Sequence, residues 1–224
     1  MTVYEMLKEM ADNFKSKVEP DYTFLAQLNV EDTNESFYIK IDNGEVILGK
    51  GVNNEADVIL TTTYDVLRQI YEGKFNAITA AAKANYLDKA PLDWRFSNNK
   101  KITPDTIARF NYLGMHLFNR SDPEKVLLDE EHSRVVHGGH AIGLYYATGL
   151  RSAWYMLKKG ESLNQEGDTN PFHQAMIFIE GEGFAKIGDK TVKVKKGESY
   201  YIPPNTSHVV WTESDEPLVL IWLA

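Results

Sequence analysis

The pattern of apolar and polar positions changes character about half-way along the chain. Up to residue 119, segments with a helical period are mixed with short alternating segments. In residues 3–14, apolar side chains recur every three or four positions after Thr2, and Glu5 completes a capping box. This pattern predicts an amphipathic helix. Three further helices are predicted at residues 63–73, 75–85 and 103–118, and the first and last of them begin with a capping threonine.

The segments between the first two helices are short, rich in β-branched residues and separated by turn residues such as those of "DNGE". These features are typical of strands joined by tight turns. They predict a four-stranded meander at residues 23–30, 35–42, 45–51 and 57–62, and "LDWRF", residues 92–96, is a candidate fifth strand. The N-terminal region is therefore expected to be an α+β domain with an antiparallel sheet and helices.

The helical pattern stops after the polar segment "NRSDPEK", residues 119–125. Seven short apolar segments follow between residues 152 and 223, with Gly-Asp and Lys-Gly turns between them. Such a series predicts an all-β sandwich or barrel. The polar segment is the expected boundary between two domains, residues 1–119 and 125–224.

Charge and composition narrow the class of partner. The 224 residues carry a net charge of −8 and no cysteine. The acidic balance argues against nucleic acid or an anionic membrane surface as the main partner. Disulfide and thiolate chemistry are excluded. Because no apolar run approaches the roughly 20 residues of a membrane span and the first segment is no secretory signal, we expect a cytoplasmic protein without membrane insertion.

The segment from Gly160 to His208 resembles the cupin family. The second cupin motif is matched by Gly197, Pro203 and His208, and the hairpin "IEGEGFAKIGD", residues 179–189, also fits. The resemblance implies a double-stranded β-helix barrel that holds a ligand or a metal ion in its mouth.

The first cupin motif, two histidines followed by a glutamate, is replaced. Alignment through the hairpin places Asp168, Asn170 and Gln174 at the three ligand positions, with His173 beside the last. Zinc and iron favour neutral imidazoles and carboxylates, whereas amides are weak ligands. A site of Asp168, Gln174 and His208 would therefore be poor. A divalent iron, zinc, nickel or manganese ion remains an open expectation, with Asp168, His173 and His208 as its ligands if His173 turns inward.

Each of these residues also has a plain structural interpretation. His208 would be a buried histidine hydrogen-bonded to Gln174 or Asn170, because buried polar groups need partners. His173 would lie exposed in a loop, and Asp168 would be a turn residue. The nearby "HGGH" brings His137 and His140 close together, either as an exposed flexible turn or over the mouth of the barrel.

Strand alternation predicts which side chains face the inside of the barrel. Two sets of inward side chains are expected, Gln174, Met176 and Phe178 on one strand and His208, Val210 and Thr212 on another. Four further candidates for the inside are Trp154, Met156, Asn170 and Tyr201. Apolar walls with a few polar groups suit a small organic ligand. The alternative is that the same residues only fill the barrel core.

Residues 37–86 resemble the sterol-carrier-protein family, most clearly in "ADVILTTTYDVLRQIYEGKFNAITA", residues 56–80. The resemblance implies an apolar tunnel between sheet and helices that accepts lipids or acyl chains, lined by Leu67, Ile70, Tyr71, Phe75 and Ile78. The alternative is that these are ordinary core residues on helix faces. This half contains no paired acid and base, nucleophile elbow or phosphate loop.

Two functions of different class follow. The first is binding or sensing of a hydrophobic small molecule or lipid by a two-domain protein whose cupin pocket lacks the full set of metal ligands. The alternative is a metal-dependent cupin enzyme, a dioxygenase or isomerase acting on a small apolar substrate, with His208 as its surest ligand. A regulatory module with a protein partner is a third possibility. A homodimer through the cupin domain is expected, because cupin domains commonly pair through their sheets.

Overall fold

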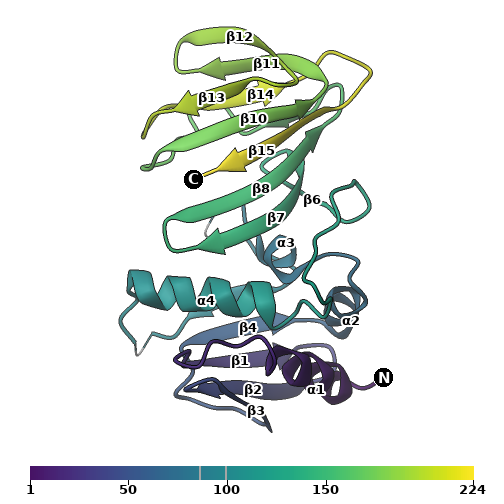
Figure 1. The fold of residues 1–224 in the computed structure, drawn as a ribbon, viewed down its shortest axis with the longest axis vertical. Coiled ribbons are helices and arrows are strands. Elements are labelled where there is room, and N and C mark those ends of the chain that lie inside the picture. The colour runs from purple at the N-terminus through teal and green to yellow at the C-terminus, as the bar shows by residue number, and fades with distance from the viewer. Residues whose placement is uncertain (86, 99) are drawn as a thin grey trace. The chain divides into compact units, whose positions relative to one another are not determined.

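The computed structural model describes residues 1–85, 87–98 and 100–224 (Figure 1). The chain forms two compact units. The N-terminal unit comprises Met1–Ala82, Leu87–Leu127 and Tyr146–Thr148, and the C-terminal unit comprises Lys83–Tyr86, Leu128–Tyr145 and Gly149–Ala224. Tyr86, the last residue of the segment that resembles sterol carrier proteins, lies outside the described residues.

The helices of the N-terminal unit begin at the capping residues that the sequence predicts. They are α1 (Val3–Phe14), α2 (Tyr64–Glu72), α3 (Ala77–Ala81) and α4 (Pro104–His116). The side chains of Thr2, Thr63 and Thr103 each accept a hydrogen bond from the first turn of α1, α2 and α4. Helix α3 is much shorter than the predicted 75–85. It ends early because the carbonyls of Ala80 and Ala81 accept bonds from Leu92 N, at 3.1 Å, and from Trp94 Nε1, at 2.9 Å, in place of a further helical turn.

The sheet of the N-terminal unit is not a simple meander. Its strands are β1 (Phe24–Val30), β2 (Glu35–Asp42), β3 (Glu45–Lys50), β4 (Val58–Thr62) and β5 (Asp93–Phe96), in the order β3-β2-β1-β4-β5. Strand β4 pairs in parallel with β1, from Ala26 opposite Val58 onward, and does not follow β3. The apolar pattern explains why β4, and not β3, lies in the interior of the sheet. Val58 and Leu60 are buried and need a central position, whereas β3 buries only Val46 and suits an edge.

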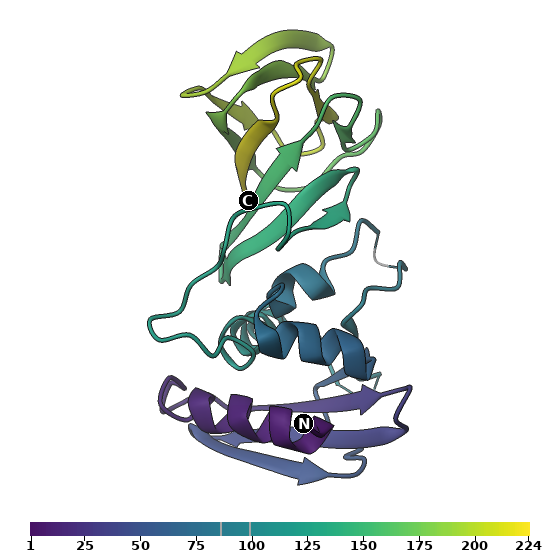
Figure 2. The same ribbon diagram turned by 90° about the vertical axis from the view of Figure 1, so that its right-hand side faces the viewer.

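Helix α1 lies along this sheet (Figure 2), and its buried face enters the core of the unit. That face consists of Val3, Met6, Leu7, Met10, Ala11 and Phe14. None of the described helices combines the length and the apolar composition that crossing a membrane requires.

The C-terminal unit is all-β, as predicted. Its strands are β6 (Arg134–Val136), β7 (Gly139–Ala147), β8 (Leu150–Leu157), β9 (Ser162–Leu163), β10 (Gln174–Glu180), β11 (Glu182–Ile187), β12 (Lys190–Lys195), β13 (Ser199–Ile202), β14 (His208–Trp211) and β15 (Leu218–Leu223). One sheet has the order β13-β10-β15-β8-β7-β6 and the other β12-β11-β14-β9 (Figure 1). Buried residues from both sheets form one core cluster, which includes Phe178 and Leu220 of the first sheet and Ala185 and Val210 of the second. The sheets therefore enclose the core between their inner faces.

Candidate functional site

The inner face of the six-stranded sheet can be followed from the strand register. Phe178 pairs with Leu220, and Leu220 pairs with Tyr155 on the next strand. All three side chains belong to, or pack against, the core cluster. Side chains alternate between faces along a strand, so the same face carries Gln174, Met176, Trp222 and Arg151. The structure thus places the predicted set of Gln174, Met176 and Phe178 together on the inside.

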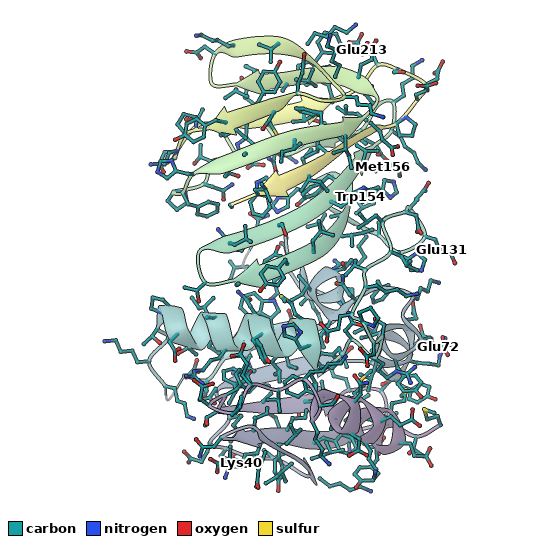
Figure 3. All side chains as sticks on the ribbon, viewed as in Figure 1. Lys40, Glu72, Glu131, Trp154, Met156 and Glu213 are labelled. Atoms are coloured by element: carbon teal, nitrogen blue, oxygen red, sulfur yellow. The ribbon has the colours of Figure 1, made fainter. Side chains whose placement is uncertain are left out.

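Three other predicted inward residues lie on the opposite face. Trp154 and Met156, which Figure 3 labels on β8, pair with Ile221 and Val219, and these two alternate with the core residues of β15. Tyr201 pairs with Ala175, also outside the inner set, and is 58% exposed. The prediction failed because β8 and β13 carry apolar or aromatic residues at successive positions, so the local pattern does not tell one face from the other.

Gln174, at the start of β10, is the most constrained polar side chain of the inner face. It is 3% exposed. Its Oε1 accepts hydrogen bonds from Trp222 Nε1 at 2.9 Å and from Asn170 Nδ2 at 3.2 Å. An indole nitrogen can only donate, so this contact fixes which end of the amide is oxygen. The buried Nε2 then points elsewhere, and it finds no hydrogen-bond partner among the described residues.

His208 opens β14 on the facing sheet and is 2% exposed. Its Nδ1 lies 3.1 Å from the carbonyl oxygen of Thr206, and no hydrogen bond among the described residues joins the ring to Gln174 or Asn170, the partners that the sequence suggested. A carbonyl only accepts, so Nδ1 carries the proton and Nε2 of the neutral ring is an acceptor. Burial lowers the pKa of His208, and the Thr206 bond and the charge of Asp168 offset this only in part. The ring is therefore neutral at pH 7.

The loops that carry these two residues are joined by hydrogen bonds. Asn205 N donates to the carbonyl of Asn170 at 2.6 Å, and Asn164 Nδ2 donates to the carbonyl of His208 at 3.4 Å. Thr212, the third residue of the second predicted set, is 2% exposed but has a structural role. Its hydroxyl donates to the carbonyl of Glu182 and accepts from Ser214 N.

The predicted metal ligands are not brought together. His173 is exposed, and its Nδ1 lies 2.6 Å from the hydroxyl of Tyr201, with the two rings stacked. Asp168 is an exposed turn residue that accepts from Gln165 N. Within residues 1–85, 87–98 and 100–224, no three His, Cys, Asp or Glu side chains form a group that could hold a metal ion. One neutral imidazole and an amide whose oxygen already accepts two bonds do not fit iron, zinc, nickel or manganese.

The "HGGH" segment forms the tight turn between β6 and β7. His137 and Gly138 have φ values of +56° and +87°, the left-handed pair of a two-residue hairpin turn. A Cβ at Gly138 would lie 2.2 Å from the carbonyl oxygen of Ser162, so this position requires glycine. His140 lies 3.2 Å from Ser133 Oγ and 3.3 Å from a carboxylate oxygen of Glu161. His137 and His140 are thus half-buried and not exposed, in a turn of defined backbone geometry.

Each half of the chain matches a known protein family. Residues 7–85 match the SCP-2 sterol transfer family, and residues 153–224 match the cupin domain. The chain therefore joins a unit that resembles SCP-2 proteins to a unit that resembles cupins. No curated protein matches the chain.

Solved structures similar to this chain include several cupins. A cupin 2 conserved barrel domain protein from Salinispora arenicola is 19% identical with a TM-score of 0.40, over 45% of this chain and 86% of that one. A cupin-like protein from Thermotoga maritima is 24% identical with a TM-score of 0.35, over 38% of this chain and 67% of that one. A protein from Photorhabdus luminescens is 17% identical with a TM-score of 0.41, over 44% and 84% of the two chains.

The cupin unit also carries inner-face residues that sequence reasoning missed. Trp222 fixes the amide of Gln174, and the guanidinium of Arg151 lies over the rings of Phe172 and Trp222. The alternation of Leu218, Leu220 and Trp222 could have indicated the inward face of β15. An arginine at the start of the apolar strand β8 was a further signal.

The predicted tunnel residues of the SCP-2-like unit divide into two groups. Leu67 and Ile70 are fully buried in the core, whereas Tyr71, Phe75 and Ile78 are half-buried. Sequence reasoning missed the half-buried aromatic cluster of Trp94, Phe96 and Phe110, whose ring centroids lie 5.2–5.8 Å apart. Aromatic side chains that stay partly accessible inside such a unit provide an apolar surface for a ligand.

Proposed function

We propose that this protein binds a hydrophobic small molecule or lipid, and that the cupin unit holds a polar group of the ligand without a metal ion. The two family resemblances support a protein that binds a lipid or small molecule. The observation that carries the finer proposal is the buried Nε2 of Gln174. A buried donor without a partner costs roughly 1–3 kcal/mol, and a ligand acceptor would remove that cost.

The polar pattern of the site agrees with this role. Gln174 offers a donor whose direction is fixed by Trp222, and the neutral ring of His208 offers an acceptor at Nε2. A few fixed polar groups among otherwise apolar walls give a ligand its orientation. The apolar surroundings are Met176, Phe178, Val210 and Leu220, all buried.

The first experiment is native mass spectrometry of the protein purified without a tag, with metal content measured on the same sample. We expect an organic molecule that leaves on denaturation and is lost in Gln174→Met, with metal far below one ion per chain. The control Tyr201→Phe, on the outer face, should keep the molecule. Stoichiometric metal that disappears in His208→Ala, with no organic adduct, would instead support the metal-dependent enzyme and refute the proposal.

The SCP-2-like unit supplies an apolar surface in the same proposal. Its support is the family resemblance and the half-buried cluster around Trp94, the sole tryptophan in residues 1–127. Titration with the fluorescent fatty acid cis-parinaric acid tests this role, because energy transfer from Trp94 reports binding nearby. Transfer should fall in Trp94→Phe, and any transfer that remains comes from Trp154, Trp211 and Trp222 of the C-terminal unit. Transfer that is unaffected by this change would mean that the probe binds away from Trp94.

We also propose that the protein is a homodimer through the outer face of the six-stranded sheet. Ile177 and Ile221 pair there and remain partly exposed, beside the exposed Tyr201. Light scattering after size exclusion should give the dimer mass for the wild type and the monomer mass for Ile177→Lys. The control Ile47→Lys changes an isoleucine that is 45% exposed on β3 and should remain dimeric. A monomeric wild type would refute this proposal.

A further inference from the structure

Arg151, at the start of β8, is held by aromatic rings. Its Cζ lies 4.2 Å from the ring centroid of Phe172 and 5.8 Å from that of Trp222. Both distances are within the range of cation–π attraction. No carboxylate in the described part of the chain forms an ion pair with this guanidinium. The positive charge is therefore placed by ring contacts, and its N–H groups are not used by an acidic side chain.

Arg151 and Gln174 belong to one row across three strands. Arg151 and Ala224 exchange backbone hydrogen bonds of 2.6 Å and 2.9 Å. Because Leu223 pairs with Ala175, the next step of the same register places Gln174 opposite Ala224. The two Cα atoms are thus two strand spacings apart, about 10 Å. The small side chain of Ala224 lies between them in the row, and both Arg151 and Gln174 contact the indole of Trp222.

The polar groups that this row carries are donors. The guanidinium offers a planar fork of N–H groups, and Gln174 offers its unpartnered Nε2. The amide oxygen of Gln174 is already used by Trp222 and Asn170. A ligand group that satisfies both donors must be an acceptor with more than one oxygen.

The charge of the site selects among such groups. Arg151 supplies one positive charge, and the neutral ring of His208 supplies none. A carboxylate balances that charge and fits the guanidinium fork with two parallel hydrogen bonds. A phosphate dianion would leave one negative charge without a counterpart in a half-buried site, which is unfavourable.

We propose that the ligand of the cupin unit is an amphipathic carboxylate, whose carboxylate is bound by Arg151 and by Gln174 Nε2 and whose apolar part lies against Trp222 and Phe172. This inference rests on the proposed function and names the chemical class of its ligand. Charge-assisted hydrogen bonds are about twice as strong as neutral ones, so Arg151 contributes most of the preference for the anion.

The test compares three probes that share one alkyl chain: decanoate, decanol and decylamine. Affinity is measured by calorimetry. Hydrogen-exchange mass spectrometry of peptides that cover residues 150–157 and 218–224 assigns binding to the cupin unit and separates it from binding in the SCP-2-like unit. We expect decanoate to bind the cupin unit about tenfold or more tightly than decanol, and decylamine to bind weakest. Arg151→Met should abolish the preference for decanoate and leave decanol affinity within about threefold.

Two further variants keep the test decisive if Arg151→Met fails to fold. Arg151→Lys retains the charge without the fork and should keep only part of the preference, and Tyr201→Phe on the outer face should behave as the wild type. Equal affinity for decanoate and decanol in the wild type would overturn the carboxylate while leaving small-molecule binding intact. If no probe protects the peptides of the C-terminal unit from exchange, the proposal of a carboxylate ligand is wrong. If, in addition, no molecule co-purifies with the protein, the proposed function is wrong as well.

Discussion

The unpartnered donor of Gln174 can be tested against a second buried glutamine in the same chain. Gln27, on β1, is 2% exposed, and Gln174 is 3% exposed. Gln27 is satisfied at both ends: Oε1 accepts from Asn53 N at 2.8 Å and Nε2 donates to Asn29 Oδ1 at 3.1 Å. Substitution by methionine keeps the length and approximate volume of either side chain, so the two variants differ mainly in hydrogen bonding.

The expected costs follow from the partners. Gln27→Met removes two good hydrogen bonds, each worth about 1 kcal/mol, and relieves no unpaired group, so it should cost about 2 kcal/mol of unfolding free energy. Gln174→Met also removes two bonds, worth about 2 kcal/mol, but it relieves a buried unpaired donor that costs about 1–3 kcal/mol, so its net cost is about −1 to +1 kcal/mol. Each variant also leaves a donor without its acceptor, Asn53 N or Trp222 Nε1, and this cost is common to both.

The assay is urea unfolding monitored by hydrogen-exchange mass spectrometry, because peptides from each unit report its unfolding separately. The proteins should be refolded from denaturant first, because a bound ligand at 100 times its Kd adds about 2.7 kcal/mol to the wild type. Gln174→Met should unfold at urea concentrations much closer to those of the refolded wild type than Gln27→Met does. A loss of 2 kcal/mol or more in Gln174→Met, equal to that of Gln27→Met, would refute the reasoning, because it would mean that the Gln174 amide is fully satisfied within the fold.

Three other outcomes are expected. Burial holds the pKa of His208 below its ordinary value of 6.5, so the contribution of the neutral ring to stability is fully present above pH 6.5 and is lost as the pH falls below 6.5. In a pH series of urea midpoints, His208→Asn should therefore reduce the fall of the midpoint below pH 6.5. A fall as steep as that of the wild type would contradict this. Gly181→Ala should destabilise the cupin unit by at least about 2 kcal/mol more than Gly149→Ala in urea unfolding. Both glycines have left-handed φ, +72° and +76°, but only at Gly181 would a Cβ meet an atom, the carbonyl oxygen of Pro217 at 2.2 Å; equal costs would refute the steric argument. Thr103→Ala should cost about 1 kcal/mol and speed amide exchange at the start of α4, whereas unchanged exchange would show that the cap is not used.

Local signals in the sequence predicted local structure well. Thr2 and Thr103 cap the helices that the apolar period predicts, because capping and amphipathicity act within a few residues. The length of α3 was wrong because its end is set by Leu92 and Trp94, which approach from β5. The position of β4 beside β1 was missed for the same reason: strand order depends on pairing between distant segments, and the apolar pattern of a single strand does not specify its neighbour.

In the candidate site too, features set by neighbouring residues were predicted and features set by distant residues were not. Alternation placed Gln174 and His208 on inner faces, since each strand there alternates between buried and less buried positions. It failed for Trp154, where both faces of β8 are apolar. The direction of the Gln174 amide depends on Trp222, nearly fifty residues later in the chain, and no local pattern contains that information.

The parallel pairing of β1 with β4 divides the sheet of the SCP-2-like unit into two chain-continuous lobes. Helix α1 and strands β1 to β3 come from residues 3–50, whereas β4, β5 and the remaining helices come from residues 58–116. The lobes meet along the seam from Ala26 opposite Val58 to Val30 opposite Thr62, and the link between them is an exposed loop in which Val52 is 69% accessible. A cut in this loop breaks no strand, so the unit is suited to fragment complementation, in which two separately made halves report their encounter by rebuilding one sheet.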